Sequence, residues 1–268
     1  MPMTTADSRG NGEPALPVFV TGASSGIGAA FARHYAVRGA TLGLVARRRE
    51  ELEVLAASLP VCCHLYPLDV TDAKALAAAG RDFIERAGVP GIVIANAGVS
   101  TGTLTEEADD LAAFERVLRV NVAGMANSFH PFVAPMRAAG RGRLVGTASV
   151  AGIRGLPGAG AYSASKAAAI TYLESLRVEL RGSGVRVVTL APGYVETPMT
   201  AVNPYPMPFL LPVDEAVRRM ARIIDAGRAY AVVPWQMGIV ARLMRLLPNW
   251  AYDRLAARAG RKPRGLSL

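Results

Sequence analysis

The chain has 268 residues, of which 51% are hydrophobic and 19% charged, and its formal net charge is +9. This composition indicates one globular domain and excludes a fibrous or largely disordered chain. No apolar run reaches the roughly 20 residues of a membrane-spanning helix, and the first fifteen residues contain no apolar stretch typical of a secretory signal. We therefore expect a cytoplasmic protein that begins with a disordered tail, residues 1–15.

Strands and helices alternate along the rest of the chain. The predicted strands lie within residues 17–25, 40–47, 61–70, 91–98, 142–149, 185–192 and 229–234. The predicted helices lie at 26–38, 48–57, 72–87, 159–181 and 214–226, with two more between 106 and 139. Such alternation gives a parallel sheet covered on both faces. We predict an α/β fold with a doubly wound parallel sheet of about seven strands in one domain, residues 16–234, followed by a helical extension, residues 235–268.

A glycine-rich turn separates the first strand from the first helix. The segment TGASSGIG places Gly22, Gly26 and Gly28 where the backbone must turn sharply and approach a ligand closely. A helix N-terminus at such a turn binds a pyrophosphate with its free N–H groups. Glycine that serves only the geometry of the turn is the alternative, but the position after the first strand favours a dinucleotide site.

The end of the second strand indicates which dinucleotide is preferred. A NAD-binding fold usually offers an acid to the adenosine ribose here, but the chain reads Ala46-Arg47-Arg48-Arg49. Arg47 can pair with a 2′-phosphate, so the sequence favours NADP(H) over NAD(H). The alternative, arginines that only begin a solvated helix, suits Arg49 better than Arg47.

Two further strand ends carry predicted cofactor contacts. Asp69 follows the third strand, where it can accept a hydrogen bond from the adenine amino group while Val70 packs on the ring. A helix N-cap is the alternative role for Asp69, although Asp72 is better placed for it. The small residues from Asn96 to Gly98 end the fourth strand, as close approach to a cofactor requires.

A tyrosine and a lysine lie one helical turn apart in GAYSASKAA, residues 160–168. Tyr162 and Lys166 share one helix face, so the ammonium is expected to lower the pKa of the tyrosine and make it a usable acid or base. Ser149 is expected close enough to hydrogen-bond a carbonyl oxygen. The trio suits hydride chemistry, with Tyr162 as proton donor. A surface tyrosine that packs along a lysine stem is the alternative.

Taken together, these segments resemble the short-chain dehydrogenase/reductase family over residues 17 to about 234. The matching motifs are TGASSGIG, NAG, the asparagine of VNVAG, the serine of TAS, YSASK and APGYVETP. The resemblance implies a Rossmann-type fold and an NAD(P)-dependent reaction at a CH–OH group. It also implies that Asn121 interrupts a helix, holds a water in a proton relay and forms a catalytic tetrad with Ser149, Tyr162 and Lys166.

The resemblance extends to the cofactor contacts and to assembly. Pro192 and Gly193 match the segment that receives the nicotinamide, Thr197 is expected to contact its carboxamide, and Lys166 its ribose. The expected cofactor contacts are Gly22, Ser24, Ser25, Gly26, Ile27, Gly28, Arg47, Asp69, Val70, Asn96, Ala97, Gly98, Tyr162, Lys166, Pro192, Gly193, Val195 and Thr197. A homodimer or homotetramer is expected through the long helices that carry Asn121 and Tyr162.

Neither a metal site nor a disulfide is expected. The adjacent Cys62 and Cys63 lie in a predicted strand and would point to opposite faces. The three histidines, at positions 34, 64 and 130, have no ligand-like spacing with the cysteines.

The C-terminal extension is basic and amphipathic. From Pro234 to Leu268 seven Lys/Arg face one Asp, which accounts for six of the nine units of net charge. Apolar residues recur at near-helical spacing at Ile239, Val240, Leu243, Leu246 and Leu247. Three interpretations remain open: packing on a neighbouring subunit or the lid, contact with an anionic membrane surface, and contact with an acidic protein. Nucleic acid is not expected, because no recognition motif accompanies the charge.

The segment NPYPMPFLLP, residues 203–212, holds four prolines and should be a loop beside a pocket. Because this lid is apolar, we expect a lipophilic carbonyl or alcohol substrate, such as a long-chain keto compound, a sterol-like ketone or an acyl thioester. A regulator or scaffold that binds NADP without turnover is the alternative function. The intact tetrad argues against it, because such a protein has no chemical need for all four side chains.

Overall fold

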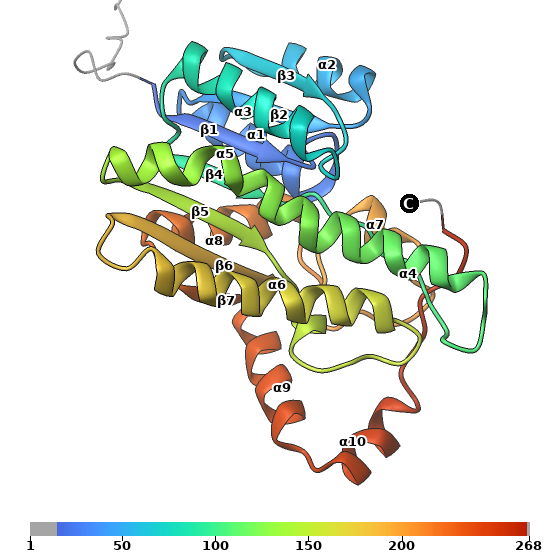
Figure 1. The fold of residues 1–268 in the computed structure, drawn as a ribbon. Helices are drawn as coiled ribbons and strands as arrows, with labels where there is room; N and C mark the ends of the chain where they lie inside the picture. The colour runs from blue at the N-terminus through green and yellow to red at the C-terminus, as the bar shows by residue number, and fades with distance from the viewer. Residues whose placement is uncertain (1–14, 267–268) are drawn as a thin grey trace, which may run out of the picture.

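The computed structural model describes residues 15–266, so the predicted disordered tail lies outside it except for its last residue. Within this range seven parallel strands form one sheet in the order β3-β2-β1-β4-β5-β6-β7 (Figure 1). The strands are β1 (Pro17–Thr21), β2 (Thr41–Ala46), β3 (Cys63–Pro67), β4 (Ile92–Ala95), β5 (Gly142–Thr147), β6 (Val185–Pro192) and β7 (Tyr230–Val233). The predicted doubly wound sheet is confirmed. The strand order reverses between β1 and β4, which is where ligands bind in such sheets.

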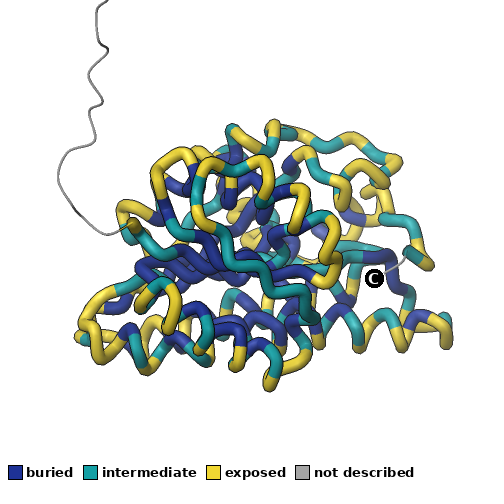
Figure 2. The backbone as a smooth tube through the Cα atoms, turned by 90° about the horizontal axis from the view of Figure 1, so that it is seen from above, coloured by how far each residue is buried: buried dark blue, intermediate teal, exposed yellow. Residues whose placement is uncertain are grey.

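Helices cover both faces of the sheet, and the buried residues gather between the layers (Figure 2). One face carries α1 (Gly26–Val37), α2 (Arg49–Ala57) and α8 (Val213–Asp225). The other carries α3 (Ala73–Ala87), α4 (Asp110–Leu118), α5 (Gly124–Ala138) and α6 (Gly160–Glu179). Strands β1 to β6 supply both cores because successive side chains point to opposite faces.

The first strand shows how the sequence selects this packing. Val18 and Val20 enter one core, while Phe19 enters the other, where its ring lies 4.8 Å from that of Phe132 between centroids. A Cβ on Gly43 of β2 would come within 2.5 Å of the Phe19 ring, so glycine there makes room for the aromatic side chain. Burying such a ring contributes about 2–3 kcal/mol to folding.

The segment predicted as two helices between 106 and 139 is one continuous helical run. A π-helical segment, Arg119–Ala123, joins α4 directly to α5. The wider π turn takes up an extra residue without ending the helix. The two predicted helices are thus observed as α4 and α5, joined without a loop, and the interruption expected at Asn121 falls inside the π segment.

The chain after β6 builds the side of the molecule beyond the carboxyl ends of the strands. A short helix, α7 (Pro198–Ala201), precedes residues 203–212, which form no helix or strand. After β7, α9 (Trp235–Leu246) and α10 (Asn249–Ala256) project from the body as an arm (Figure 1). Among residues 15–266 no helix combines the length and the apolar character needed to cross a membrane.

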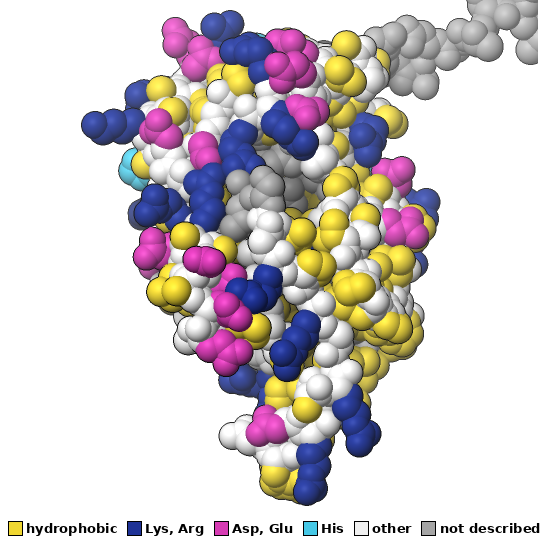
Figure 3. Space-filling view, turned by 90° about the vertical axis from the view of Figure 1, so that its right-hand side faces the viewer, with side chains coloured by type: hydrophobic (Ala, Val, Ile, Leu, Met, Phe, Trp, Pro, Cys, Tyr) yellow, Lys and Arg dark blue, Asp and Glu magenta, His cyan; other side chains and the backbone are white. Residues whose placement is uncertain are grey.

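The arm presents its predicted apolar face outward. Leu243 and Leu246 are 59% and 80% exposed, whereas α9 packs on the body through Met237, Gly238 and Ala241. Small residues let the helix approach β7 closely, since a Cβ on Gly238 would lie 3.2 Å from Cβ of Val232. Figure 3 shows hydrophobic side chains with Lys and Arg beside them at the lower tip of the molecule, which the arm forms.

Candidate active site

A cleft at the carboxyl ends of the strands begins at the turn between β1 and α1. Gly22 and Gly26 have φ angles of 69° and 53°, in the left-handed region that favours glycine. A Cβ on Gly28 would lie 2.0 Å from the carbonyl oxygen of Gly22, so only glycine fits at position 28. The turn thus brings the free N–H groups of α1 to the cleft, where they fit the pyrophosphate of a dinucleotide.

Arginines gather at the end of the cleft next to β2. Arg47, Arg48 and Arg116 all line it. Arg48 donates from Nη2 to Ser24 Oγ at 3.1 Å, and its Nη1 lies 3.0 Å from Glu51 Oε1. Because Ser24 belongs to the glycine turn, Arg48 ties the turn to the start of α2. Guanidinium groups at this position fit an additional phosphate on the adenosine ribose.

Both carboxylate oxygens of Asp69 are engaged within the protein. Arg116 Nη2 donates to Oδ2 at 2.6 Å, while the Thr71 backbone N–H and hydroxyl donate to Oδ1 at 2.9 and 2.8 Å. Burial opposes ionisation of this carboxyl, but the bonds from Arg116 and Thr71 outweigh it and lower the pKa of Asp69 to about 2. The N-cap of α3 is Asp72, as preferred from the sequence, with Oδ1 accepting from the Ala75 N–H at 2.9 Å.

Ser149, Tyr162 and Lys166 meet at the other end of the cleft. Ser149 follows β5 and caps a short 3₁₀ helix, Val150–Gly152, while Tyr162 and Lys166 lie one turn apart on α6. A hydrogen bond joins Ser149 to Tyr162. Lys166 Nζ lies 5.7 Å from the centroid of the Tyr162 ring and donates to the Thr147 carbonyl at 2.7 Å.

The ionisation of this pair differs from the sequence-based expectation. Burial raises the pKa of Tyr162, although the hydrogen bond with Ser149 acts in the opposite direction. Burial also lowers the pKa of Lys166 to about 8. The prediction that Lys166 lowers the pKa of Tyr162 is therefore wrong for the protein by itself, because desolvation dominates both groups and the ammonium is bonded to Thr147.

Asn121 lies behind the cleft rather than on its wall. It is fully buried in the π segment and bonds the backbone of Val99 twice, accepting from N–H at 2.8 Å and donating to C=O at 3.0 Å. Its Nδ2 also donates to Ser165 Oγ at 2.9 Å. A Cβ on Gly98 would lie 3.2 Å from Asn121 Oδ1 and 3.6 Å from Lys166 Nζ, so Asn121 and Lys166 flank this glycine.

The last wall of the cleft is formed by residues after β6. Thr197 begins α7 with a capping box in which Thr197 and Thr200 exchange hydrogen bonds. A Cβ on Gly26 would approach Thr197 Cγ2 to 3.2 Å. The segment 197–212, which includes α7 and which we call the lid from here on, therefore meets the glycine turn. A Cβ on Gly193 would come within 2.8 Å of Met237 Cγ, which places the segment expected to receive the nicotinamide directly against α9.

The structure brings most of the predicted site residues to one cleft. The lining residues among them are Gly22, Ser24, Ser25, Gly26, Ile27, Arg47, Asp69, Val70, Asn96, Ala97, Gly98, Ser149, Tyr162, Lys166, Pro192, Gly193, Val195 and Thr197. Gly28 lies beneath Gly22, and Asn121 lies behind Gly98.

Other lining residues were missed from the sequence. Arg48 lies in the arginine run that the sequence drew attention to, but only the fold shows that it reaches Ser24. Arg116 gave no signal, because it reaches Asp69 from α4, 47 positions further along the chain. Leu68, Thr147 and Met199 also line the cleft, and small or apolar residues of this kind carry no motif.

Comparison with known proteins identifies the family. A sequence model described as short chain dehydrogenase matches residues 17–205. The chain belongs to this short-chain dehydrogenase family. As a short-chain dehydrogenase it is an NAD(P)-dependent oxidoreductase that acts on CH–OH groups, and its Rossmann-type sheet is the fold that binds the dinucleotide.

Relatives agree with this assignment. An uncharacterized oxidoreductase of Myxococcus xanthus is 41% identical over 242 residues, which cover 89% of this chain and 95% of the relative. A sulfoacetaldehyde reductase of Chromohalobacter salexigens is 36% identical over 189 residues, covering 69% of this chain and 75% of the relative. The crystal structure of an alcohol dehydrogenase from Thermococcus sibiricus with 5-hydroxy-NADP matches with a TM-score of 0.71 and 28% identity, covering 82% of this chain and 96% of that chain.

Proposed function

We propose that the protein is an NADP(H)-dependent carbonyl reductase, or alcohol dehydrogenase in the reverse direction. The observation that carries this proposal is the meeting of Ser149, Tyr162 and Lys166 at one end of a cleft whose other end holds the glycine turn and three arginines. A dinucleotide of extended shape fits between these ends. When bound, it supplies or accepts the hydride.

The side chains of the chain then handle the oxygen and its proton. Ser149 and Tyr162, already hydrogen-bonded to each other, point two hydroxyls at one carbonyl oxygen and hold it. Tyr162 donates its proton as the alcohol forms, and it takes the proton back in the reverse direction. Its high pKa keeps the phenol protonated at neutral pH, which suits the reduction.

Lys166 and Asn121 support this proton transfer. Lys166 has a pKa near 8 and therefore gains or loses a proton easily around neutral pH, while its bond to Thr147 holds it beneath the tyrosine. Asn121 fixes the backbone of Val99 and, with Lys166, flanks Gly98. We propose that Lys166 supplies protons to Tyr162. We propose that Asn121 positions the segment that follows β4.

The preference for NADP(H) is supported by the arginines beside β2. No carboxylate follows β2 directly, and Arg47 and Arg48 line the cleft there. Asp69, the nearest acid on the third strand end, is already paired with Arg116 and so adds little repulsion toward a 2′-phosphate.

The substrate proposed for this site is a lipophilic carbonyl compound. The lid exposes apolar side chains, with Met199, Val202 and Phe209 at 37%, 42% and 49% exposure. The rings of Tyr194 and Tyr205 pack edge to face beside them, with centroids 6.4 Å apart. An apolar wall favours long-chain, cyclic or sterol-like ketones and acyl thioesters over sugars.

For assembly we propose a cytoplasmic homodimer or homotetramer that pairs through α4, α5 and α6. Exposed apolar residues on α4 and α6, among them Leu111 and Val178 at 57% and 61%, support this surface. The outward apolar face and the arginines of the arm leave contact with an anionic membrane or an acidic protein as a proposal for α9 and α10.

Fluorescence titration with NADPH and NADH, followed by oxidation of NADPH with a panel of carbonyl compounds, tests the proposal. The panel holds long-chain aldehydes, cyclic ketones, acyl thioesters, sugars and small anionic aldehydes. We expect tighter NADPH binding and turnover on the apolar members. Tight binding without any turnover would favour the non-catalytic regulator, and better reduction of sugars or of small anionic aldehydes would contradict the lipophilic substrate.

The arginines can be tested in the same titration. Arg48→Ala removes a guanidinium beside the glycine turn and is expected to weaken NADPH binding by about tenfold. NADH binding should weaken less, because only the bond to Ser24 is lost for that dinucleotide. Arg49→Ala is the matched control, because the Arg49 pair with Glu53 at 3.6 Å is a surface contact. Equal losses for the two dinucleotides would contradict the role of Arg48.

A further inference from the structure

The chain after α10 returns to the substrate side of the cleft. Residues 257–266, which we name the strap, form no helix or strand and run from the tip of the arm back to the body (Figure 1). The strap contacts two walls of the cleft, the loop after β4 and the lid.

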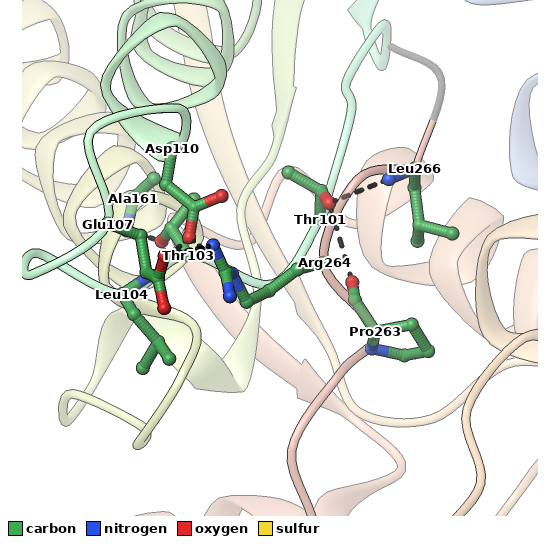
Figure 4. Close-up of polar contacts among 9 residues, drawn as sticks. All are labelled: Thr101, Thr103, Leu104, Glu107, Asp110, Ala161, Pro263, Arg264 and Leu266. Atoms are coloured by element: carbon green, nitrogen blue, oxygen red, sulfur yellow. Dashed lines mark hydrogen bonds and ion pairs between the residues drawn. The ribbon is translucent and has the colours of Figure 1, made fainter.

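The first wall is the loop after β4. The Gly102 N–H donates to the Pro263 carbonyl at 2.8 Å. The Leu266 N–H donates to Thr101 Oγ1 at 3.3 Å (Figure 4). A Cβ on Gly102 would come within 2.3 Å of the Lys262 carbonyl oxygen. The strap and the loop therefore touch backbone to backbone.

An ionic contact fixes the strap to the start of α4. Arg264 donates from Nε to Asp110 Oδ2 at 2.7 Å, and its Nη2 lies 3.1 Å from Glu107 Oε2 (Figure 4). The same carboxylate of Asp110, which is buried, accepts the Leu104 N–H at 2.8 Å. The Leu104 bond and the Arg264 guanidinium lower the pKa of Asp110, so the carboxylate stays charged near neutral pH and holds loop and strap together.

The second wall is the lid. Lys262 Nζ donates to the Met199 carbonyl of α7 at 2.9 Å, and Met199 lines the cleft. A Cβ on Gly260 would lie 2.3 Å from Cβ and 2.5 Å from Cγ of Tyr205. The Tyr205 side chain is thus seated directly on the backbone of the strap.

Tyr205 also contacts a tyrosine that follows β6. Its ring packs edge to face on Tyr194. Burial raises the pKa of Tyr205 to about 12, and the nearby phenols of Tyr194 and Tyr162 contribute to the rise. Tyr205 therefore links the strap to Tyr194, a residue that follows β6.

We propose that the strap, by seating Tyr205 and joining loop to lid, limits the size of the carbonyl compound that the site accepts. The inference rests on the proposed carbonyl reduction and adds the determinant of substrate size. A compact carbonyl compound fits under the joined loop and lid, whereas a bulkier one must displace the lid or the strap.

The test compares cyclohexanone with 4-tert-butylcyclohexanone, which share the reacting group and differ in bulk. Arg264→Met releases the ionic contact, and Tyr205→Ala removes the side chain through which the strap packs on the lid. Each is expected to raise the ratio of kcat/KM, bulky over compact ketone, by about tenfold, mainly through KM. Arg258→Met removes the same charge from the strap at an exposed residue whose side chain makes no described contact, and it should keep the wild-type ratio.

A second pair of variants changes no charge, and its result does not depend on whether the first variants fold. Gly260→Ala places a methyl group against Tyr205 and should shift the ratio in the same direction. Gly155→Ala is its control, because a Cβ there meets nothing within 4 Å.

The outcomes separate the inference from the function on which it rests. Ratios within about twofold of wild type in Arg264→Met, Tyr205→Ala and Gly260→Ala, with unchanged NADPH affinity, would overturn the inference alone. A wild-type protein that reduces no carbonyl compound at all would overturn the proposed function and the inference together.

Discussion

The two ends of the cleft are built from different kinds of contact. At the dinucleotide end, short segments directly after β1 and β2 form the site, and Ser24 meets Arg48 only 24 positions away. At the substrate end, the partners are far apart along the chain, as with Arg264 and Asp110, which are 154 positions apart. A site made of strand ends is fixed by the sheet, whereas a site made of lid and strap depends on contacts that a few substitutions can change.

Where the two ends meet, Tyr162→Phe should have the largest effect. Removal of the phenolic proton is expected to lower kcat by about 10³-fold, while NADPH binding stays close to wild type because the glycine turn and arginines are intact. Steady-state kinetics and fluorescence titration measure the two quantities. Tyr172→Phe, on the same helix but outside the cleft, serves as the control, and residual turnover near wild type in Tyr162→Phe would remove the tyrosine from the mechanism.

Gly28→Ala is expected to damage the dinucleotide end most. The added Cβ would lie 2.0 Å from the Gly22 carbonyl oxygen, and backbone cannot move aside as a flexible side chain can. We expect the free energy of unfolding to fall by about 2–3 kcal/mol and NADPH affinity to fall with it. Urea unfolding provides the measurement, with Gly155→Ala as the variant that should lose neither. Wild-type stability in Gly28→Ala would show that the turn is more adaptable than its geometry indicates.

Acid should weaken the dinucleotide end through Asp69. Its pKa is lowered from 3.8 to about 2, so the stabilisation is fully present above about pH 4 and is lost as the pH falls through about 2. As the pH falls from about 4 to about 2, the free energy of unfolding of wild type should drop by about 1–2 kcal/mol more than that of Asp69→Asn. This figure allows for the partial exposure of the Asp69 side chain. Urea titrations at several pH values test this, and Arg116→Gln should remove most of the difference. Parallel pH curves for wild type and Asp69→Asn would contradict it.

The smallest effect is expected at the base of the arm. The Tyr252 hydroxyl donates to the Gly155 carbonyl, and the Arg154 guanidinium lies 3.9 Å from the centre of the Tyr252 ring. Tyr252→Phe removes the hydrogen bond and keeps the ring, so it should lower the free energy of unfolding by about 1 kcal/mol and leave NADPH affinity unchanged. A change in NADPH affinity beyond about twofold would show that the arm and the dinucleotide end are coupled.

The positions of the elements were largely readable from local pattern. The helix expected at 72–87 is observed as Ala73–Ala87 and begins at the preferred cap, Asp72, because an Asx N-cap and an amphipathic repeat are short-range features. The joint between α4 and α5 was not readable, since a π turn replaces a loop without any breaker residue. The sequence left open what the apolar residues of α9 contact, and only the structure shows that Gly238 and Ala241 are buried while the larger side chains stay outside.

The sequence by itself determined the sheet, the glycine turn, the grouping of Ser149, Tyr162 and Lys166, and the family to which they belong. Each depends on residues whose spacing matches one element or one turn, and such spacing is visible in one dimension. Only the tertiary structure decided that Arg116 pairs with Asp69, that burial raises the pKa of Tyr162, and that the strap seats Tyr205. Desolvation and contacts between distant segments depend on what the folded chain places around a residue, and no local pattern encodes that surrounding.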